Sequence, residues 1–137
     1  MKLRLLRLFL VFTALGWGVT GVGVFASWPQ VNDIAQGMGA KPIVYDPMLD
    51  YWLRMISGAF ALVGVWYLAL ALWPQKFHAA IPWFGGLMMA EGVILLVHGL
   101  RLELSPFPFY GDVSASLLGG VGILYFSRAA RPQPGIG

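Results

Sequence analysis

Long uncharged runs constrain the fold of this chain more than any other feature. Residues 8 to 32 contain no Asp, Glu, Lys or Arg. About 20 such residues make a helix about 30 Å long, which matches the hydrocarbon core of a bilayer. Further runs cover residues 55 to 75, 79 to 97 (interrupted only by Glu91) and 113 to 127. These runs predict four membrane-spanning segments.

The composition agrees with a lipid environment. Hydrophobic residues make up 58% of the 137 residues and charged residues only 11%, whereas soluble domains carry about 25% charged residues. Backbone polar groups in lipid must be satisfied internally, and these runs lack the alternating polarity of barrel strands. We therefore predict an all-α fold, an integral membrane four-helix bundle that forms a single domain over residues 1–137.

The expected helices cover about residues 5–27, 50–73, 79–101 and 108–128. A long outer loop, 28–49, separates the first two, and residues 31–36 within it could form a short helix on the outer surface. The connection after the second helix is short, so we expect the second and third helices to be antiparallel neighbours.

The charges predict an orientation. Three regions that four crossings place on one side contain no acid, and they carry Lys2, Arg4, Arg7, Lys76, His78, Arg128 and Arg131. The other side carries Asp33, Asp46, Asp50, Glu103 and Asp112, with Lys41 and Arg101 as its bases. By the positive-inside rule both termini are cytoplasmic, and we expect a multi-pass protein of the bacterial cytoplasmic (inner) membrane.

Two features near the N-terminus have alternative interpretations. A basic start, an apolar run and Val24-Phe25-Ala26 resemble a cleavable signal peptide, but the run is longer than the usual 7–15 residues, so we expect a retained helix. Residues 16 to 21, GWGVTG, match the G-x-G-x-x-G fingerprint of dinucleotide sites. That fingerprint needs a preceding strand and an acid about 20 residues later, and neither is present, so we interpret these glycines as packing residues.

Small residues recur four apart in every predicted helix. Such pairs lie on one helical face and let helix backbones approach closely in lipid. We predict that they form the packing faces of a tight bundle, of a docked partner helix, or of both. The pairs are Ala14 and Gly18, Ser57 and Ala61, Gly86 and Ala90, and Ser116 and Gly120.

Ionisable residues inside a bilayer cost about 2.5–3.5 kcal/mol and are often functional. Glu91 is the clear case. We expect Arg54, which enters the second helix one turn after Asp50, to reach Glu91 from the neighbouring helix. His98 lies two turns from Glu91 on the same face, and Arg101 follows at the interface. The candidate buried polar cluster is Asp50, Arg54, Glu91, His98 and Arg101.

The sequence gives little support for catalysis or for a cofactor. It has no cysteine, no P-loop, no Ser-His-Asp arrangement and no paired-carboxylate motif, so we predict a protein that is not an enzyme, with no cofactor and no metal. His78 and His98 are expected at opposite membrane faces and cannot clamp one haem, and the spacing of His98, Glu103 and Asp112 does not support a metal site. No dense basic run indicates nucleic-acid binding.

The layout resembles a bacterial family of small uncharacterised four-helix inner-membrane proteins. The resemblance rests on the stretch from Asp50 through Arg54 to Gly58, on Gly64, and on the Trp73-Pro74 exit. It implies an Arg followed by small residues at the start of the second helix and a Pro at its end. Since the family is a domain of unknown function, the resemblance implies a topology and no activity.

Two functional hypotheses follow. The first is an accessory or structural subunit of a membrane assembly, which packs through its Gly/Ala faces against other membrane proteins or another copy of itself within the lipid bilayer. The alternative is an outward-facing site for a small ligand, a lipid headgroup or a proton, built on Arg54, Glu91 and His98. A closed Arg54–Glu91 ion pair would favour the first hypothesis, and a polar cavity that opens outward would favour the second.

Overall fold

The computed structural model describes residues 1–104 and 106–131, and within these residues it contains helices and no strands. The helices are α1 (Lys2–Gly18), α2 (Val22–Phe25), α3 (Trp28–Gly37), α4 (Pro47–Leu72), α5 (Ile81–Arg101) and α6 (Pro106–Phe126), with 3₁₀ segments η1 (Val19–Gly21) and η2 (Ser127–Ala130). Four spans are long and apolar enough to cross a membrane: Lys2–Phe25, Pro47–Leu72, Ile81–Arg101 and Pro106–Ala130. The predicted all-helical chain with four such helices is confirmed, and it suggests a multi-pass membrane protein.

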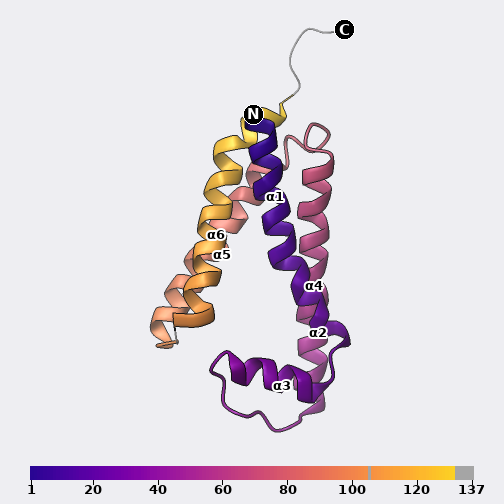
Figure 1. Cartoon of the computed structure of the whole chain (residues 1–137), viewed down its shortest axis with the longest axis vertical. Coiled ribbons are helices and arrows are strands. Elements are labelled where there is room, and N and C mark those ends of the chain that lie inside the picture. Colours follow the sequence, from indigo (N-terminus) through magenta and orange to yellow (C-terminus); the bar gives the residue numbers. More distant parts are fainter. Residues whose placement is uncertain (105, 132–137) are drawn as a thin grey trace.

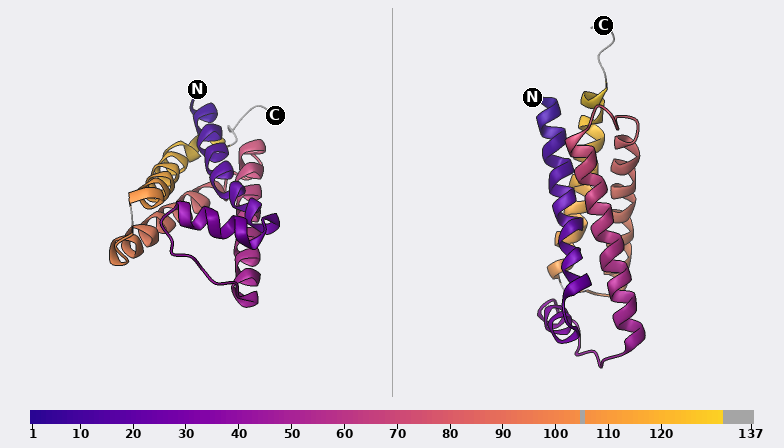
Figure 2. Two further views of the ribbon diagram at one scale, coloured as in Figure 1. Left: turned by 60° about the horizontal axis from the view of Figure 1, so that its bottom comes forward. Right: turned by 90° about the vertical axis from the view of Figure 1, so that its right-hand side faces the viewer.

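The four long helices form two pairs. α1 packs along α4, α5 packs along α6, and α1 joins the pairs by contacting α6. The start of α1 and the end of α6 lie at one end of the molecule, here called the terminal end (Figure 1). Helix α3 lies across the opposite end, here called the α3 end. Toward it the α5–α6 pair diverges from the α1–α4 pair in Figure 1 and in the left view of Figure 2.

Small residues bring α1 and α4 into backbone contact. A Cβ added to Gly64 would lie 2.6 Å from the backbone N of Gly18 and 2.8 Å from the carbonyl O of Ala14. Nearer the α3 end, a Cβ on Gly21 would lie 3.2 Å from the Cβ of Ala61. Only residues without bulk allow this approach, so these positions set the distance between the two helices.

Glycines seven residues apart bring α5 against α6. A Cβ on Gly85 would lie 2.9 Å from Leu124, one on Gly92 would lie 2.7 Å from Leu117, and one on Gly99 would overlap the ring of Phe109. Seven residues make about two helical turns, so these three glycines share one face of α5. Larger side chains of α6 fill the space that the glycines leave.

The fully buried apolar side chains gather toward the terminal end. They include Leu6 and Leu10 of α1, Leu70 of α4, Ile81 of α5 and Ile123 of α6, each at most 1% exposed. These residues lie between the start and the middle of α1, near the end of α4, at the start of α5 and near the end of α6. The bundle is therefore tightly packed at the terminal end, where the helix pairs meet.

Helices α4 and α5 are not lengthwise neighbours, so the prediction drawn from their short connection is wrong. They do touch near the terminal end, where the Tyr67 hydroxyl donates a hydrogen bond of 2.9 Å to the carbonyl O of Phe84. Beyond that contact each helix follows another partner, α1 for α4 and α6 for α5. The close packing at small residues fixes these two pairs, and the connection only holds the ends of α4 and α5 together.

Local hydrogen bonds define the elements at the α3 end. The side chain of Gln30 accepts a hydrogen bond of 2.8 Å from the backbone N of Ser27, which completes a capping box at the start of α3. The expected short helix in the outer loop is thus present as α3. Asp46 caps α4 by accepting from Met48 N at 2.7 Å. In α6, Phe107 has non-helical backbone angles, so the regular helix follows it.

Candidate polar site

Arg54 is bound within the α1–α4 pair. Its Nη2 lies 2.8 Å from Oδ1 of Asp50, one turn earlier on α4. Its Nη1 donates to the carbonyl oxygens of Gly23 (2.9 Å), Val24 (3.2 Å) and Ala26. Gly23 and Val24 lie in α2 and Ala26 is its C-cap, a place where helical carbonyl groups lack partners in their own helix. Arg54 therefore caps the C-terminal end of α2 with a positive charge, a favourable arrangement for a helix dipole.

The expected Arg54–Glu91 ion pair does not form. Among residues 1–104 and 106–131 the salt bridge of Arg54 is with Asp50, and Glu91 has no salt bridge. The reason is the helix pairing: α4, which carries Arg54, turns toward α1, whereas α5, which carries Glu91, turns toward α6. The predicted polar cluster is thus divided between the two helix pairs.

Glu91 lines a cavity of about 250 Å³ between the helix pairs, here called the Glu91 cavity. Glu91 is the middle residue of the 21-residue helix α5. The polar groups around this cavity are two carboxylates and three hydroxyls, from Glu91, Asp112, Thr13, Thr20 and Ser116. None of the residues that line it is Lys, Arg or His, so no basic side chain of the lining balances the two acids.

Thr13 places an unsatisfied hydroxyl at this cavity. The residue is 2% exposed, and its Oγ1 has no hydrogen-bond partner among the residues that the structure describes. Leaving a buried hydroxyl unpaired costs about 1–3 kcal/mol. A helical Thr can avoid this cost by bonding to a carbonyl of the preceding turn, as Thr20 does with Trp17 at 2.6 Å. The Oγ1 atom of Thr13 lies against α6, since a Cβ built on Gly119 would be 3.1 Å from it.

Aromatic side chains form the apolar part of the lining. Trp17 and Phe60 meet edge to face with ring centroids 4.9 Å apart, and Phe12 also lines the cavity. The indole N–H of Trp17 donates to Sδ of Met88 at 3.3 Å, which fixes the ring against α5. The Glu91 cavity thus combines carboxylates, hydroxyls and aromatic rings that come from all four long helices.

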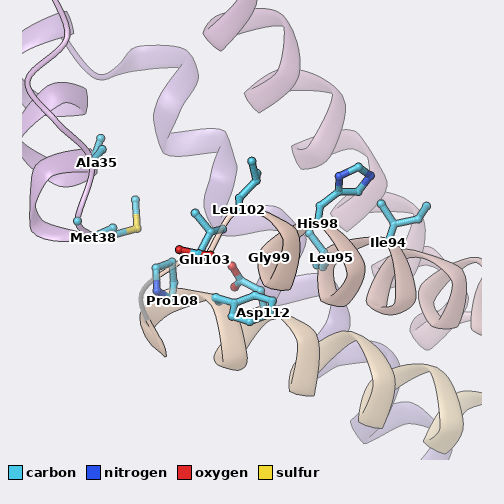
Figure 3. Close-up of a pocket in the computed structure, with 14 residues that line it drawn as sticks. Ala35, Met38, Ile94, Leu95, His98, Gly99, Leu102, Glu103, Pro108 and Asp112 are labelled. Atoms are coloured by element: carbon cyan, nitrogen blue, oxygen red, sulfur yellow. The ribbon is translucent and has the colours of Figure 1, made fainter.

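His98 lines a second, larger cavity of about 480 Å³ at the α3 end, here called the His98 cavity. Glu103 and Asp112 also line it, and their carboxylates lie in the middle of the view in Figure 3, whereas the imidazole of His98 points away from them. Met38, which follows α3, belongs to the same lining. In the described part of the chain no group of three His, Asp or Glu side chains could hold a metal ion.

The two cavities are neighbours, since Leu95 and Asp112 line both. Together they run from the α3 end to the middle of α5, where Glu91 lies. Toward the terminal end the buried residues Leu10, Ile81 and Ile123 fill the space between the helices. The combined space therefore reaches the α3 end and does not extend to the terminal end.

Most of the predicted packing residues lie at helix contacts. Ala14, Gly18 and Ala61 lie where α1 and η1 meet α4, and Ser57 lies where α2 meets α4, since its Oγ would overlap a Cβ on Gly23. A Cβ on Gly120 would lie 3.0 Å from the carbonyl O of Gly85, and Ser116 is buried beside the Glu91 cavity.

The predicted pair on α5 lies elsewhere. Gly86 and Ala90 are exposed, and nothing lies within 4 Å of a Cβ built on Gly86. The residues that α5 uses are Gly85, Gly92 and Gly99, which the prediction did not include. Their spacing of seven was the signal that could have found them.

Thr13 and Trp17 were also not predicted as parts of a polar site. A single Thr or Trp in an apolar run is ordinary, and only the position of α1 beside α5 and α6 brings them to Glu91. Arg101, by contrast, is exposed in the last turn of α5 and is not among the residues that line the two cavities.

Comparisons of the chain with protein-family models, curated proteins and solved structures gave no significant match.

Proposed function

We propose that this protein is a multi-pass protein of the bacterial cytoplasmic membrane that binds a small ligand in the Glu91 cavity. In this proposal both termini are cytoplasmic, the α3 end faces outward, and the ligand enters through the His98 cavity. The charge distribution supports the orientation, because the start of α1, the connection between α4 and α5, and the segment that follows α6 contain no acid and lie at the terminal end.

One observation carries the proposal: the middle of α5 places an acid beside a cavity instead of beside a base. A carboxylate in the interior of a bilayer is costly unless it is paired or faces a polar cavity. Arg54 is occupied by Asp50 and by the end of α2. Glu91 instead lines a space that continues to the α3 end. This arrangement favours a site that opens outward over an ion pair that fixes the register of the helices.

Cysteine accessibility tests the proposal directly, because the natural chain has no cysteine. Ala115 lines the Glu91 cavity, while its neighbour Ser114 is exposed on the outer surface of α6. We expect Ala115→Cys to react with a small membrane-impermeant thiol reagent added outside intact cells, and the matched control Ser114→Cys to remain unmodified in lipid. Modification of neither variant, or of Ala115→Cys only from the cytoplasmic side, would refute the proposal.

A second candidate function, an accessory subunit, has its own support. Gly86 and Ala90 form a small-residue face on α5 that no other part of the described chain covers, and such faces mediate association of membrane helices. If a second copy docks there, Ala90→Cys should give a disulfide-linked dimer under mild oxidation in membranes, and Gly86→Leu should abolish it. If another protein docks there, Gly86→Leu should abolish its co-purification while the variant still elutes as a folded monomer.

A further inference from the structure

The chemistry of the Glu91 cavity identifies a class of ligand, an inference that rests on the proposed function. We propose that the cavity holds a small organic cation, a quaternary or protonated amine, between the carboxylates of Glu91 and Asp112 and the rings of Trp17 and Phe60. The proposal follows from charge, from the aromatic wall, and from the volume of the cavity.

The charges of the residues that line the cavity exclude an anionic ligand. Two of the twelve residues that line the cavity are acids and none is Lys, Arg or His. Because this space is surrounded by apolar side chains, the field of the acids is screened much less than it would be in water. An anion placed here would face two carboxylates with no compensating base, whereas a cation would supply the positive charge that the lining lacks.

The aromatic wall favours an organic cation over a bare metal ion. Aromatic rings attract ammonium groups through their electron-rich faces, and cages of such rings recognise quaternary amines. Trp17 and Phe60 are held by their edge-to-face contact at 4.9 Å and by the hydrogen bond from Trp17 to Met88. Metal ions need several oxygen or nitrogen ligands in a close shell, and in the described residues no cluster of three His, Asp or Glu side chains offers one.

The size of the cavity limits the guest. The volume of about 250 Å³ lies just below the usual range for drug-sized ligands, about 300–1,000 Å³, which limits the guest to a small amine.

Charge-selective modification of Ala115→Cys tests the ligand class. The probes are 2-(trimethylammonium)ethyl methanethiosulfonate, a quaternary amine, and the anionic 2-sulfonatoethyl methanethiosulfonate. The rate at which each probe modifies the cysteine is divided by the rate at which the same probe reacts with a free thiol in water, which gives a normalised rate. We expect the cationic probe to react faster by about tenfold or more, because acidic clefts concentrate cations by such factors. Glu91→Gln combined with Asp112→Asn should bring the two normalised rates together.

A protection experiment separates an organic cation from an inorganic one. Tetramethylammonium chloride should slow the modification of Ala115→Cys more than sodium chloride does at equal ionic strength, and Trp17→Leu should reduce this protection. Size-exclusion elution in detergent confirms that each variant is folded. Equal normalised rates for both probes, or equal protection by the two salts, would overturn the cation proposal and leave the outward-opening site standing. No reaction with either probe would instead refute the proposed function itself.

Discussion

Arg54 is paired with Asp50, its Nη2 lying 2.8 Å from Oδ1. This pairing explains why Arg54 on α4 forms no ion pair with Glu91 on α5. The guanidinium also holds the carbonyl oxygens of Gly23 and Val24 at the end of α2. The charge of Arg54 is thus satisfied within the α1–α4 pair, and Glu91 is left to face the cavity between the pairs.

Double-substitution measurements should show which acid is coupled to Arg54. Arg54→Met should lower the free energy of unfolding by about 2 kcal/mol, because it removes hydrogen bonds from a charged donor to the end of α2. Combining Arg54→Met with Asp50→Asn should be less than additive, whereas combining it with Glu91→Gln should be additive within about 0.5 kcal/mol. Reversible unfolding in mixed detergent measures all three effects. Strong coupling between Arg54 and Glu91 would contradict the structure, because it would indicate an ion pair between these two residues.

Gly64 and Gly86 offer a matched test of the helix pairing. Gly64→Ala should destabilise the fold by about 1–3 kcal/mol, as overpacking does, because the added Cβ meets the backbone of Gly18 and Ala14. Gly86→Ala should be neutral or slightly stabilising, because that site is open and Ala favours a helix. Unfolding midpoints of the two variants check this order. The reverse order would show that α4 does not meet α1 at Gly64.

Thr13→Val should separate stability from binding. Val has nearly the shape of Thr without its hydroxyl, so the change removes an unpaired buried polar atom and should raise the free energy of unfolding by about 1 kcal/mol. The same variant should leave the protection of Ala115→Cys by tetramethylammonium unchanged, because this ion carries no N–H that could bond to the hydroxyl. A large loss of stability would indicate that the Thr13 hydroxyl has a structural partner.

The orientation has a simple test. Reporters fused before Met1 and after the last residue should both be active only in the cytoplasm, and a reporter inserted at Gly39, just after α3, should be active only outside. The acid-free, basic segments at the terminal end are the physical reason. Termini on different sides would mean an odd number of crossings and would contradict the proposed topology.

The four long helices could be predicted from the sequence because the length of an uncharged run and the thickness of a bilayer determine them almost alone. The pairing of helices could not be predicted in the same way. A short connection brings the ends of α4 and α5 together, but contact along their length depends on which helix faces are complementary. Gly64 lets α4 pack against α1, and Gly92 lets α5 pack against α6.

The candidate site depended on that pairing. Glu91 was recognisable in the sequence as an acid in an apolar helix, and His98 lay on its face. Its surroundings, however, come from α1 and α6, and neither Thr13 nor Asp112 is distinguished by local pattern. The mistaken Arg54–Glu91 contact followed from assuming that consecutive helices are neighbours along their whole length.

The divergence of α4 and α5 toward the α3 end creates the space that Glu91 lines. Electron–electron distance measurements between spin labels test it most directly, and the natural absence of cysteine allows the labels to be placed at will. One doubly labelled variant carries Leu72→Cys and Trp83→Cys near the terminal end, and the other carries Tyr51→Cys and Leu100→Cys near the α3 end, all at exposed positions. In lipid nanodiscs we predict a clearly longer mean distance for the second pair than for the first. Equal distances, or a shorter one for the second pair, would mean a closed parallel bundle and would contradict this account.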